Sequence, residues 1–372
     1  MLPRSVLTKR SLRVLAMVPY PAGQAPSQRF RIEQWMPHLR ALGIDCDLAP
    51  FMDSELYERL ARPGVPGRKA AGLLRAAARR WRMLAETGAY DVVFLHREAM
   101  AFGPAVLERM IASRKPVVFD FDDAIWLRNE NRVNPLAPWV KCPGKTRTIA
   151  KRAAAILAGN AYLAEWARHY NRSVYVVPTT IDTEGGYKRQ KAHGPSEVPI
   201  IGWSGTTSTL RYLEFLRPVL GELARRRRFR LRVICNGAAL HWPEVEMDWR
   251  TWGSACEVDD LIPMDIGLMP QPNEEWAKGK CGAKALQYMA LGIPPVASRN
   301  GVLPEIVEEG RSGFLADTPG EWVVRLEELL DDWKLRAAMG EQARMTVQER
   351  YSARTHVPRI ADIFHSVLGV GR

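Results

Sequence analysis

Residues 279–298 read GKCGAKALQYMALGIPPVAS, and they carry the clearest structural signal in the chain. Gly279 and Gly282 bracket a turn, and residues 283–291 after it have the apolar spacing of a helix. Gly292 ends that helix, and the prolines that follow open an apolar run typical of a buried strand. A glycine-bearing turn at a helix N-terminus presents free backbone N–H groups and the positive end of the helix dipole, which suits a diphosphate.

Lysine and glutamine side chains add to this turn. If the turn is already helical, Lys280, Lys284 and Gln287 share one face at i, i+4 and i+7. The two ammonium groups would then neutralise a departing diphosphate, and the amide of Gln287 would bind ribose hydroxyls. The alternative is a solvated polar face on an ordinary helix, which is the usual role of lysines at helical spacing.

Outward from this segment, short apolar runs alternate with helical stretches, which predicts an α/β chain with parallel sheets. Residues 182–199 (DTEGGYKRQKAHGPSEVP) interrupt the alternation and are predicted to be a linker or surface loop. We therefore expect one Rossmann-like, doubly wound domain over 1–181, a second over 200–351, and a C-terminal helix in 352–372 that packs back on the first domain. The expected strands are 13–19, 45–50, 92–96, 116–121, 155–158 and 174–178, then 200–204, 230–235, 266–270, 294–298 and 313–316.

Composition narrows the class of protein. The 372 residues fit two domains, and the net charge of +12 favours phosphorylated ligands or anionic lipid. No nucleic-acid-binding motif is present, and the twelve tryptophans are scattered along the sequence rather than grouped as a stacking platform. Five cysteines without CxxC spacing argue against a disulfide framework and a zinc site. The apolar run at 14–18 is too short for a secretory signal, so we expect a cytoplasmic protein.

A longer segment carries a family resemblance. Residues 262–316, IPMDIGLMPQPNEEWAKGKCGAKALQYMALGIPPVASRNGVLPEIVEEGRSGFLA, resemble the donor half of retaining glycosyltransferases of family 4, which have the GT-B fold. That family has a helix ending in EAMAxGxPVVAS and then a GGxPEIVxxGxxG stretch. The N-terminal half is similar more loosely, in strand order and in the run VVPTTID at 176–182. The resemblance implies two domains that face each other across a cleft, the first binding the acceptor and the second the nucleotide sugar.

The chain departs from the family pattern at two glutamates. The family commonly has E-x7-E, in which the first glutamate meets donor-sugar hydroxyls and the second meets the ribose. The matching positions here are Gly279 and Gln287, so Glu274 or Glu275 would have to replace the first carboxylate. Lys284 resembles a branch of the family that carries lysine there. The GRLxxxKG loop is also missing, and residues 202–211 read GWSGTTSTLR instead.

The resemblance and the turn chemistry together predict a set of donor-binding residues. Ser208 or Thr209 is expected to cap the helix after 202–207, and Glu305 could equally act only on a helix dipole. The predicted donor-binding residues are Gly23, Gly205, Thr206, Thr207, Lys280, Cys281, Gly282, Lys284, Gln287, Gly301, Val302 and Glu305.

Three carboxylates follow an apolar strand at 116–124 (PVVFDFDDA), and three interpretations compete for them. By resemblance, Asp122 stands at the histidine and Asp123 at the aspartate of the family's HD pair, so that Asp122 orients or deprotonates the acceptor hydroxyl or contacts the donor sugar. Alternatively, Asp120 is the nucleophile of a haloacid-dehalogenase-type phosphatase, or the DxD pair binds a divalent metal. The metal-free interpretation is favoured because it also explains the other half of the chain. His96, at the end of the preceding strand, is a further catalytic candidate beside Asp122, Asp123 and Lys284.

The helix predicted over residues 68–87 (RKAAGLLRAAARRWRMLAET) has a basic face with interspersed apolar residues. This composition suits an interfacial helix on an anionic bilayer, although the same apolar residues would also pack on a sheet. A bilayer contact would make the protein peripheral at the inner face of the membrane and the acceptor lipid-linked.

The predicted function is transfer of a sugar from a nucleoside diphosphate to a hydroxyl acceptor, with retention of configuration. The resemblance implies that the leaving phosphate accepts the acceptor proton and that no metal or cofactor is needed. The alternatives are a GT-B epimerase or hydrolase, an inactive donor-binding scaffold and the phosphatase. The sequence leaves open whether the nucleotide is UDP, GDP or dTDP, and it does not identify the sugar or the acceptor.

Overall fold

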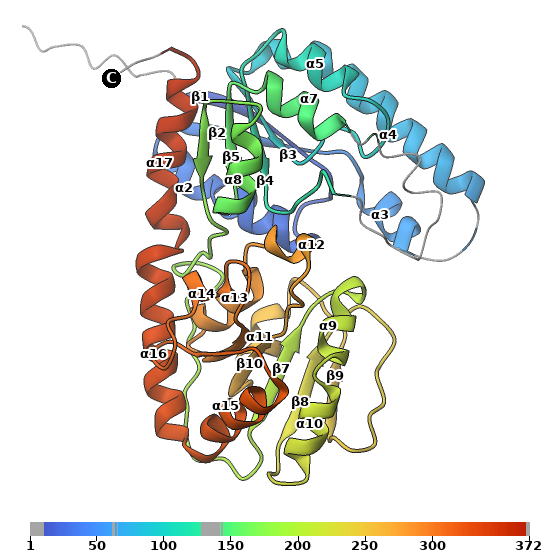
Figure 1. Cartoon of the computed structure of the whole chain (residues 1–372). Helices are drawn as coiled ribbons and strands as arrows, with labels where there is room; N and C mark the ends of the chain where they lie inside the picture. The colour runs from blue at the N-terminus through green and yellow to red at the C-terminus, as the bar shows by residue number, and fades with distance from the viewer. Residues whose placement is uncertain (1–10, 62–63, 65, 128–141, 143, 370–372) are drawn as a thin grey trace, which may run out of the picture.

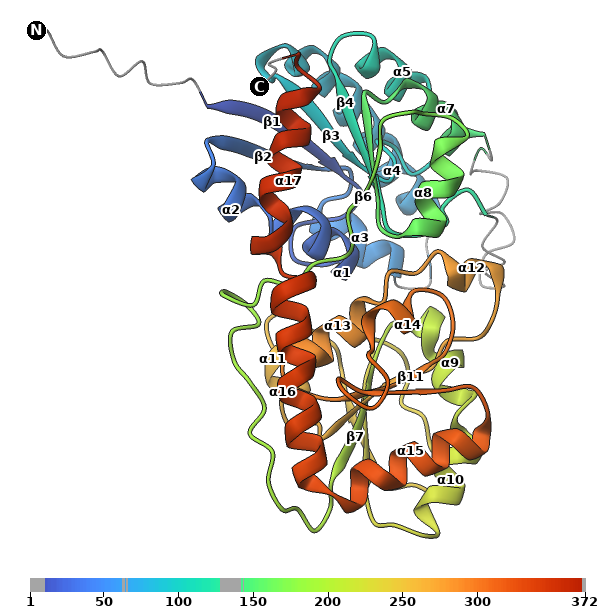
Figure 2. The same cartoon turned by 60° about the vertical axis from the view of Figure 1, so that its left-hand side comes forward.

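The computed structural model describes residues 11–61, 64, 66–127, 142 and 144–369 (Figure 1). Two six-stranded sheets, in which every strand pair is parallel, lie one above the other with helices on their faces (Figures 1 and 2). The predicted α/β class with two doubly wound sheets is therefore confirmed.

The N-terminal sheet has the order β2-β1-β3-β4-β5-β6. Alternate residues of β1 enter two different cores, because Val14 and Ala16 face one side of the sheet and Leu15 and Met17 the other. Burial on both faces explains why the strand reads as one continuous apolar run. The strands are β1 (Leu12–Val18), β2 (Ile44–Pro50), β3 (Val92–His96), β4 (Val117–Phe121), β5 (Ala155–Ala158) and β6 (Val174–Val176).

The C-terminal sheet has the order β12-β11-β10-β7-β8-β9. Its edge strand β9 was not predicted, because the half-exposed sequence MDWR lacks an apolar run. The strands are β7 (Ile200–Ser204), β8 (Arg230–Ile234), β9 (Met247–Arg250), β10 (Ile266–Met269), β11 (Pro295–Ser298) and β12 (Phe314–Ala316).

Two segments are divided into several short helical elements in the structure. The stretch 30–42 becomes a π-helix, η1 (Arg29–Glu33), followed by α2 (Met36–Ala41), and 209–226 becomes η3, α9 and α10. The other helices and short helical turns are α1 (Pro26–Gln28), α3 (Ser54–Ala61), α4 (Pro66–Glu86), η2 (Thr87–Ala89), α5 (Val106–Ala112), α7 (Lys145–Arg152), α8 (Ala161–Arg168), η3 (Thr207–Thr209), α9 (Leu210–Glu214), α10 (Arg217–Ala224), α11 (Glu257–Leu261), α12 (Glu275–Lys278), α13 (Ala283–Ala290), α14 (Leu303–Ile306), α15 (Pro319–Asp331), α16 (Trp333–Arg350) and α17 (Ala353–Ser366).

The last two helices connect the domains. Helix α16 packs on α13 of the C-terminal domain, whereas α17 packs on α2 of the N-terminal domain. Figures 1 and 2 show them end to end along one side of the molecule. Ile360 and Phe364 of α17 are fully buried in the core that lies behind β1.

Strand order locates the regions where a ligand would bind. Each sheet reverses its winding direction once, between β1 and β3 in the first domain and between β7 and β10 in the second. Ligands of open α/β sheets bind beyond the carboxyl ends of the strands at such switch points. The loops to examine are therefore those after β1, β3, β7 and β10. Among the described residues, no helix is both long and apolar enough to cross a bilayer.

Candidate active site

The turn before α13 differs from the sequence expectation. Gly282 has a left-handed backbone (φ +66°), and the helix begins only at Ala283. Lys280 therefore lies outside the helix, and the predicted common face of Lys280, Lys284 and Gln287 is wrong. Their side chains take three directions, toward Asp123, Thr209 and Tyr187 respectively.

Lys284 lies where the N-terminus of α13 meets the carboxyl end of β7. Its Nζ is 3.2 Å from Thr209 Oγ1 and 4.6 Å from the ring centre of Trp203. In the described part of the chain, no carboxylate forms an ion pair with it. Burial, reinforced by the charge of Lys280, lowers the pKa of Lys284 to about 7. This site would bind an anion favourably, because an anion would supply the missing countercharge.

The loop after β7 makes room for this lysine. A Cβ at Gly205 would overlap the Trp203 ring and lie 2.9 Å from Lys284 Nζ, so only glycine fits there. Thr206 and Thr209 form a reciprocal capping box at the start of η3. The side chain of Thr206, which was predicted to bind phosphate, therefore caps this helical turn. Thr207 is exposed beside it.

Gln287 lies in a buried network rather than on an open face. Its amide donates to the hydroxyl of Tyr187 at 2.5 Å, and that hydroxyl donates to Glu257 at 2.7 Å. Trp252 and Arg29 also bind Glu257, at 3.0 and 2.9 Å. The side chain predicted to bind ribose thus connects α13 with the linker and with the N-terminal domain.

The first of the three carboxylates, Asp120, lies within β4 and is fully enclosed. Asp120 accepts from His96 Nδ1 at 2.7 Å and from two nitrogens of Arg31, which also donates to the carbonyls of Val177 and Pro178. The π-helix η1 places Arg31 in this core, where it is entirely buried. Neither Arg31 nor Arg29 is a solvent-facing helix residue, and both already have carboxylate partners. Asp120 is not accessible as a phosphatase nucleophile.

Asp122 and Asp123 form a charged cluster with Arg97. The guanidinium of Arg97 donates to Asp122 Oδ1 at 2.9 and 3.2 Å and to Asp123 Oδ2 at 2.7 Å. Burial alone would raise the pKa of Asp122, but Arg97, His96 and Arg31 outweigh it and lower the pKa to about 2. Arg97 has φ +62°, a left-handed conformation that non-glycine residues rarely adopt. Such an outlier at a strand end is typical of a functional site.

His96 connects this cluster with the loop after β1. Its Nδ1 binds Asp120, and its Nε2 lies 3.3 Å from Ser27 Oγ. Gly23, in the same loop, has φ +76° and lies near Ser254, which is 3.9 Å from the position a Cβ would take. The loop after β1 therefore reaches both the carboxylates and the second domain.

The two domains meet at residues 278–282. The thiol of Cys281 donates to the backbone oxygen of Asp122 at 3.3 Å, and a Cβ on Gly159 would overlap this sulfur. Burial, together with Asp122, raises the pKa of Cys281 well above its usual value. Asn160 caps α8 through Leu163 N and donates across the interface to the carbonyls of Lys278 and Lys280, at 3.1 and 3.0 Å.

The surroundings of Gly279 explain why the first glutamate of the family's E-x7-E pattern is absent at this position. A Cβ there would lie 2.7 Å from Ala124 Cβ and 2.8 Å from Ala124 N, so the N-terminal domain occupies the space. The proposed substitutes are engaged elsewhere, since Glu274 pairs with Arg211 at 3.2 Å, and Glu275 pairs with Tyr162 and Lys278. Neither glutamate replaces the missing carboxylate in this arrangement.

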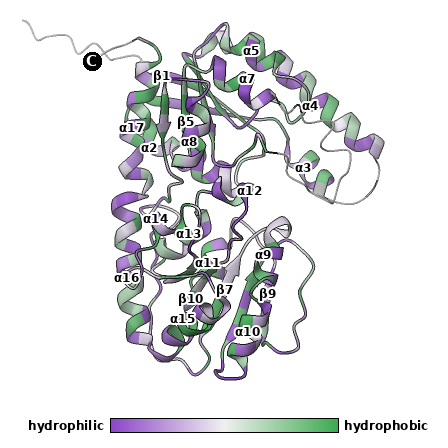
Figure 3. Ribbon diagram, viewed as in Figure 1, coloured by the Kyte–Doolittle hydropathy of each residue, from purple (hydrophilic) through white to green (hydrophobic). Residues whose placement is uncertain are grey.

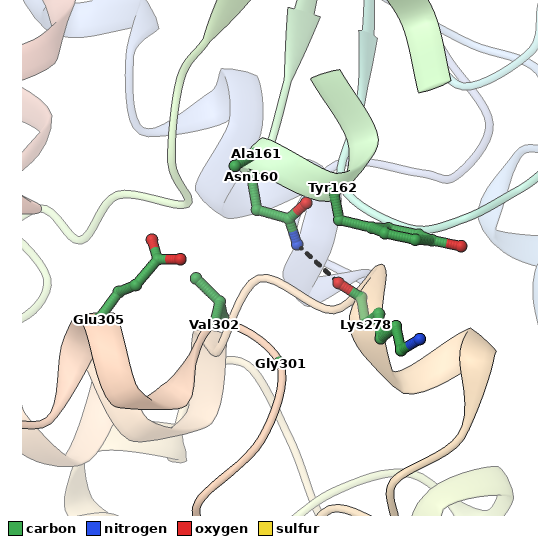
Figure 4. Close-up of a pocket in the computed structure, with 7 residues that line it drawn as sticks. All are labelled: Asn160, Ala161, Tyr162, Lys278, Gly301, Val302 and Glu305. Carbon is green, nitrogen blue, oxygen red and sulfur yellow. Dashed lines mark hydrogen bonds between the residues drawn. The ribbon is translucent and has the colours of Figure 1, made fainter. Parts of the chain in front are cut away.

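A pocket of about 280 Å³ lies between the domains (Figure 4). Gly301, with φ +56°, and Val302 form one wall, and the exposed Glu305 points toward α8. A Cβ on Gly282 would overlap Ile306 and lie 3.4 Å from Val302 Cγ1, so the turn of α13 lies close to this wall of the pocket. Its lining residues are Asn160, Ala161, Tyr162, Lys278, Gly301, Val302 and Glu305.

Tryptophans that are scattered in the sequence meet beside this pocket. The rings of Trp126 and Trp166 stack 4.2 Å apart, and Tyr162 stacks on Trp126 at 5.9 Å. Sequence analysis missed this group, as it missed Asn160. Asn160 had a detectable signal, because an asparagine between a strand and a helix is a preferred N-cap. Among the described residues, no cluster of three His, Cys, Asp or Glu side chains could hold a metal ion.

Two family models match the chain. Residues 31–185 match the model described as Glycosyltransferase Family 4, and residues 272–346 match the one described as Glycosyl transferases group 1. The D-inositol 3-phosphate glycosyltransferase of Corynebacterium kroppenstedtii is 35% identical over 109 residues, which cover 29% of this chain and 23% of that protein. The match to that relative thus spans about a quarter of its length.

Solved structures agree on the fold. Sucrose-phosphate synthase from Thermosynechococcus elongatus superimposes with a TM-score of 0.68 at 12% identity and covers 97% of this chain and 100% of its own. Anabaena HepE in complex with UDP and glucose gives 0.63 at 14% identity, covering 95% and 100%. With both halves matched by family models and the whole chain by this architecture, the chain belongs to glycosyltransferase family 4 and has the GT-B fold.

Proposed function

We propose that this protein transfers a sugar from a nucleoside diphosphate to a hydroxyl acceptor with retention of configuration. The observation that carries the proposal is Lys284, a partly buried lysine at the N-terminus of α13 that pairs with no carboxylate among the described residues. A diphosphate there would meet Lys284, the nearby Lys280 and the free N–H groups of the helix. These groups would stabilise the charge that develops on the leaving group, usually one of the largest contributions to catalysis.

The acceptor side is assigned to the carboxyl ends of β3 and β4. Asp122, ionised above about pH 2, is too weak a base to deprotonate an alcohol but suits a role in orienting a hydroxyl or stabilising positive charge on the sugar ring. The acceptor proton would then pass to an oxygen of the leaving phosphate. His96 would hold Asp120 and Ser27 in place rather than act directly, because it is fully buried.

We propose UDP as the nucleotide, with Gly23, Gly205 and Thr207 near its phosphates and the pocket at Gly301, Val302 and Glu305 for the sugar. HepE, a structural neighbour, is solved with UDP-glucose, and this likeness supports the choice. We further propose that the acceptor hydroxyl is carried on a lipid, which would bring the basic helix α4 to a bilayer.

Lys284→Ala tests the proposal. We expect donor affinity to fall at least tenfold and turnover about 100-fold or more, because the variant loses charge stabilisation of the leaving group. The matched control is Lys334→Ala, which removes an exposed lysine of α16. Calorimetry with UDP, GDP and dTDP and sugar-transfer assays provide the measurements. Near-normal transfer by the Lys284 variant would reject the assignment.

Assays with and without acceptor separate this function from the alternatives. A transferase consumes nucleotide sugar much faster with acceptor, whereas a hydrolase or epimerase acts equally without it. Binding without any turnover of the donor would identify a scaffold subunit.

A further inference from the structure

The pocket between the domains has two walls of different origin. Gly301, Val302 and Glu305 of the C-terminal domain form the wall that we assign to the donor sugar. The facing wall is the start of α8 in the N-terminal domain, where Figure 4 shows the ring of Tyr162 above Lys278. Because the N-terminal domain holds the acceptor in the proposed reaction, an acceptor in this pocket would lie against the α8 wall.

Tyr162 is held at one ring face and at its hydroxyl. The ring stacks on Trp126, with ring centres 5.9 Å apart, and Trp126 stacks in turn on Trp166 at 4.2 Å. The hydroxyl donates to Glu275 of the C-terminal domain. Burial, together with this hydrogen bond, raises the pKa of Tyr162 to about 12, so the hydroxyl stays protonated at neutral pH. The ring is therefore fixed in one orientation before a ligand binds.

The second face of the Tyr162 ring is left to the pocket. Tyr162 lines the pocket, whereas Trp126 is not among the described lining residues, so Trp126 covers the face that points away from it. A tyrosine ring supplies a large, rigid contact surface at a low cost in conformational entropy. The partial negative charge of its face attracts polarised C–H groups, and the face of a pyranose ring consists of such groups.

Charged groups near this ring face suit the hydroxyls of a sugar. The carboxylate of Glu305 is exposed, forms no ion pair with another described residue, and points toward α8 (Figure 4). The ammonium group of Lys278 supplies hydrogen-bond donors on the same side of the pocket. Hydrophobic and hydrophilic residues are interspersed along α8 (Figure 3), so that an alkyl chain would find no continuous apolar surface here. An aromatic face combined with a few charged groups is the composition expected of a small-ligand site.

The α8 wall begins next to the carboxylate that we assign to the acceptor hydroxyl. A Cβ on Gly159, which directly precedes the pocket residues of α8, would lie 3.2 Å from the Cα of Asp122. Trp126, behind the Tyr162 ring, follows Asp122 in the same loop after β4. A sugar that stacks on Tyr162 would therefore lie close to Asp122 and opposite the donor wall.

We propose that the acceptor of this enzyme is a saccharide and that Tyr162 binds it by stacking on a pyranose ring. This inference rests on the proposed transferase function and adds the chemical class of the acceptor to it. Trp126 is a positioning residue, because it orients the Tyr162 ring without contacting the sugar. Glu305 accepts hydrogen bonds from sugar hydroxyls across the pocket.

Calorimetry with octyl pyranosides tests the site directly. In the presence of UDP, the full chain should bind an octyl β-pyranoside of glucose, galactose or N-acetylglucosamine more tightly than 1-O-octylglycerol, which carries hydroxyls on the same chain but has no pyranose ring. Tyr162→Leu should weaken this binding about fivefold or more, because leucine is apolar but has no aromatic face. Tyr162→Phe keeps the face and loses only the hydrogen bond to Glu275, so affinity should change less than about twofold.

The matched control is Tyr170→Leu. Tyr170 is a half-buried tyrosine that meets Trp166 edge to face at 5.0 Å and does not line the pocket, so this variant should bind pyranosides like wild type. Equal affinity for the pyranosides and octylglycerol overturns the proposal. An equal loss of affinity in Tyr162→Leu and Tyr170→Leu also overturns it, because the aromatic group would then have only a structural role.

Transfer assays with UDP-glucose, UDP-galactose and UDP-N-acetylglucosamine separate this inference from the function on which it rests. Tyr162→Leu should raise the KM for the pyranoside about fivefold or more and leave kcat nearly unchanged, because stacking contributes to binding rather than to the chemical step. Transfer to octylglycerol as fast as to the pyranosides would keep the transferase and overturn the saccharide acceptor. Pyranoside binding that depends on Tyr162, without turnover of any of these UDP-sugars, would reject the transferase and support the saccharide site.

Discussion

At the scale of single residues, Lys284 and Arg97 show what a pattern can and cannot predict. Lys284 is recognisable because it stands inside a turn-and-helix pattern that fits a diphosphate. Arg97 stands after a strand without any periodic signal, and its importance lies in a backbone angle of φ +62° and in two carboxylates far away in the sequence. Contacts between distant segments therefore could not be predicted from the sequence, whereas the local helix that carries Lys284 could.

The pKa of Lys284 makes donor binding depend on pH. With a pKa of about 7, the free side chain is half neutral near pH 7, and a bound diphosphate would raise that pKa. Affinity for UDP should be full below pH 7 and should decrease as pH rises through 7 toward the pKa of the complex, by at most tenfold per pH unit. Calorimetry in buffers of different ionisation heat should detect proton uptake on binding between pH 7 and 8.

Lys284→Arg is the control for this effect. Arginine keeps its charge throughout this range, so UDP affinity should become independent of pH except for the titration of UDP itself. Equal pH profiles for wild type and Lys284→Arg would show that Lys284 does not bind the diphosphate.

At the scale of secondary-structure elements, the apolar strands could be predicted from the sequence. The polar edge strand and the irregular helix could not. Eleven strands follow from apolar runs, whereas β9, with the sequence MDWR, has no such run. The π-helix η1 cannot be predicted from apolar residues spaced at 3.6 residues per turn, yet it places the side chain of Arg31 in the core. The predicted sheets were therefore accurate, whereas the directions of side chains such as Gln287 were not.

Asn160 allows the helix cap to be separated from the domain contact. Asn160→Asp keeps the oxygen that caps Leu163 N but loses the amide that donates to Lys278 and Lys280. Hydrogen exchange should show an unchanged α8 and faster exchange at 278–282 in this variant. Asn160→Ala should also destabilise α8, by about 0.5–2 kcal/mol. Unchanged protection at 278–282 in Asn160→Asp would mean that these bonds do not hold the domains together.

Restoring the family glutamate should harm this protein. Gly279→Glu places a Cβ within 2.8 Å of the Ala124 backbone, so we expect about 1–3 kcal/mol of destabilisation and slower transfer. Gly279→Ala separates the cost of the Cβ from that of the charge. Thermal unfolding and transfer assays give the result, and faster transfer by Gly279→Glu would show that the domains separate here during catalysis.

At the scale of the whole molecule, the C-terminal helix α17 packs into the core of the N-terminal domain. Strand order follows from the alternation of elements, but the packing of α17 on β1 and β3 depends on contacts between the two ends of the sequence. Phe364 is fully buried and meets Phe94 of β3 edge to face, with ring centres 6.1 Å apart. The C-terminal helix is thus part of the N-terminal core and connects the stabilities of the two domains.

Phe364→Ala should therefore destabilise the N-terminal domain specifically. Loss of a buried phenylalanine costs about 3–5 kcal/mol, whereas Asp362→Ala on the exposed face of the same helix should cost almost nothing. Native-state hydrogen exchange should show faster opening at β1 and β3 and unchanged protection at β7 and β8. Equal loss of protection in both sheets would mean that the domains unfold as one cooperative unit, because α16 and α17 would then transmit the damage along the side of the molecule.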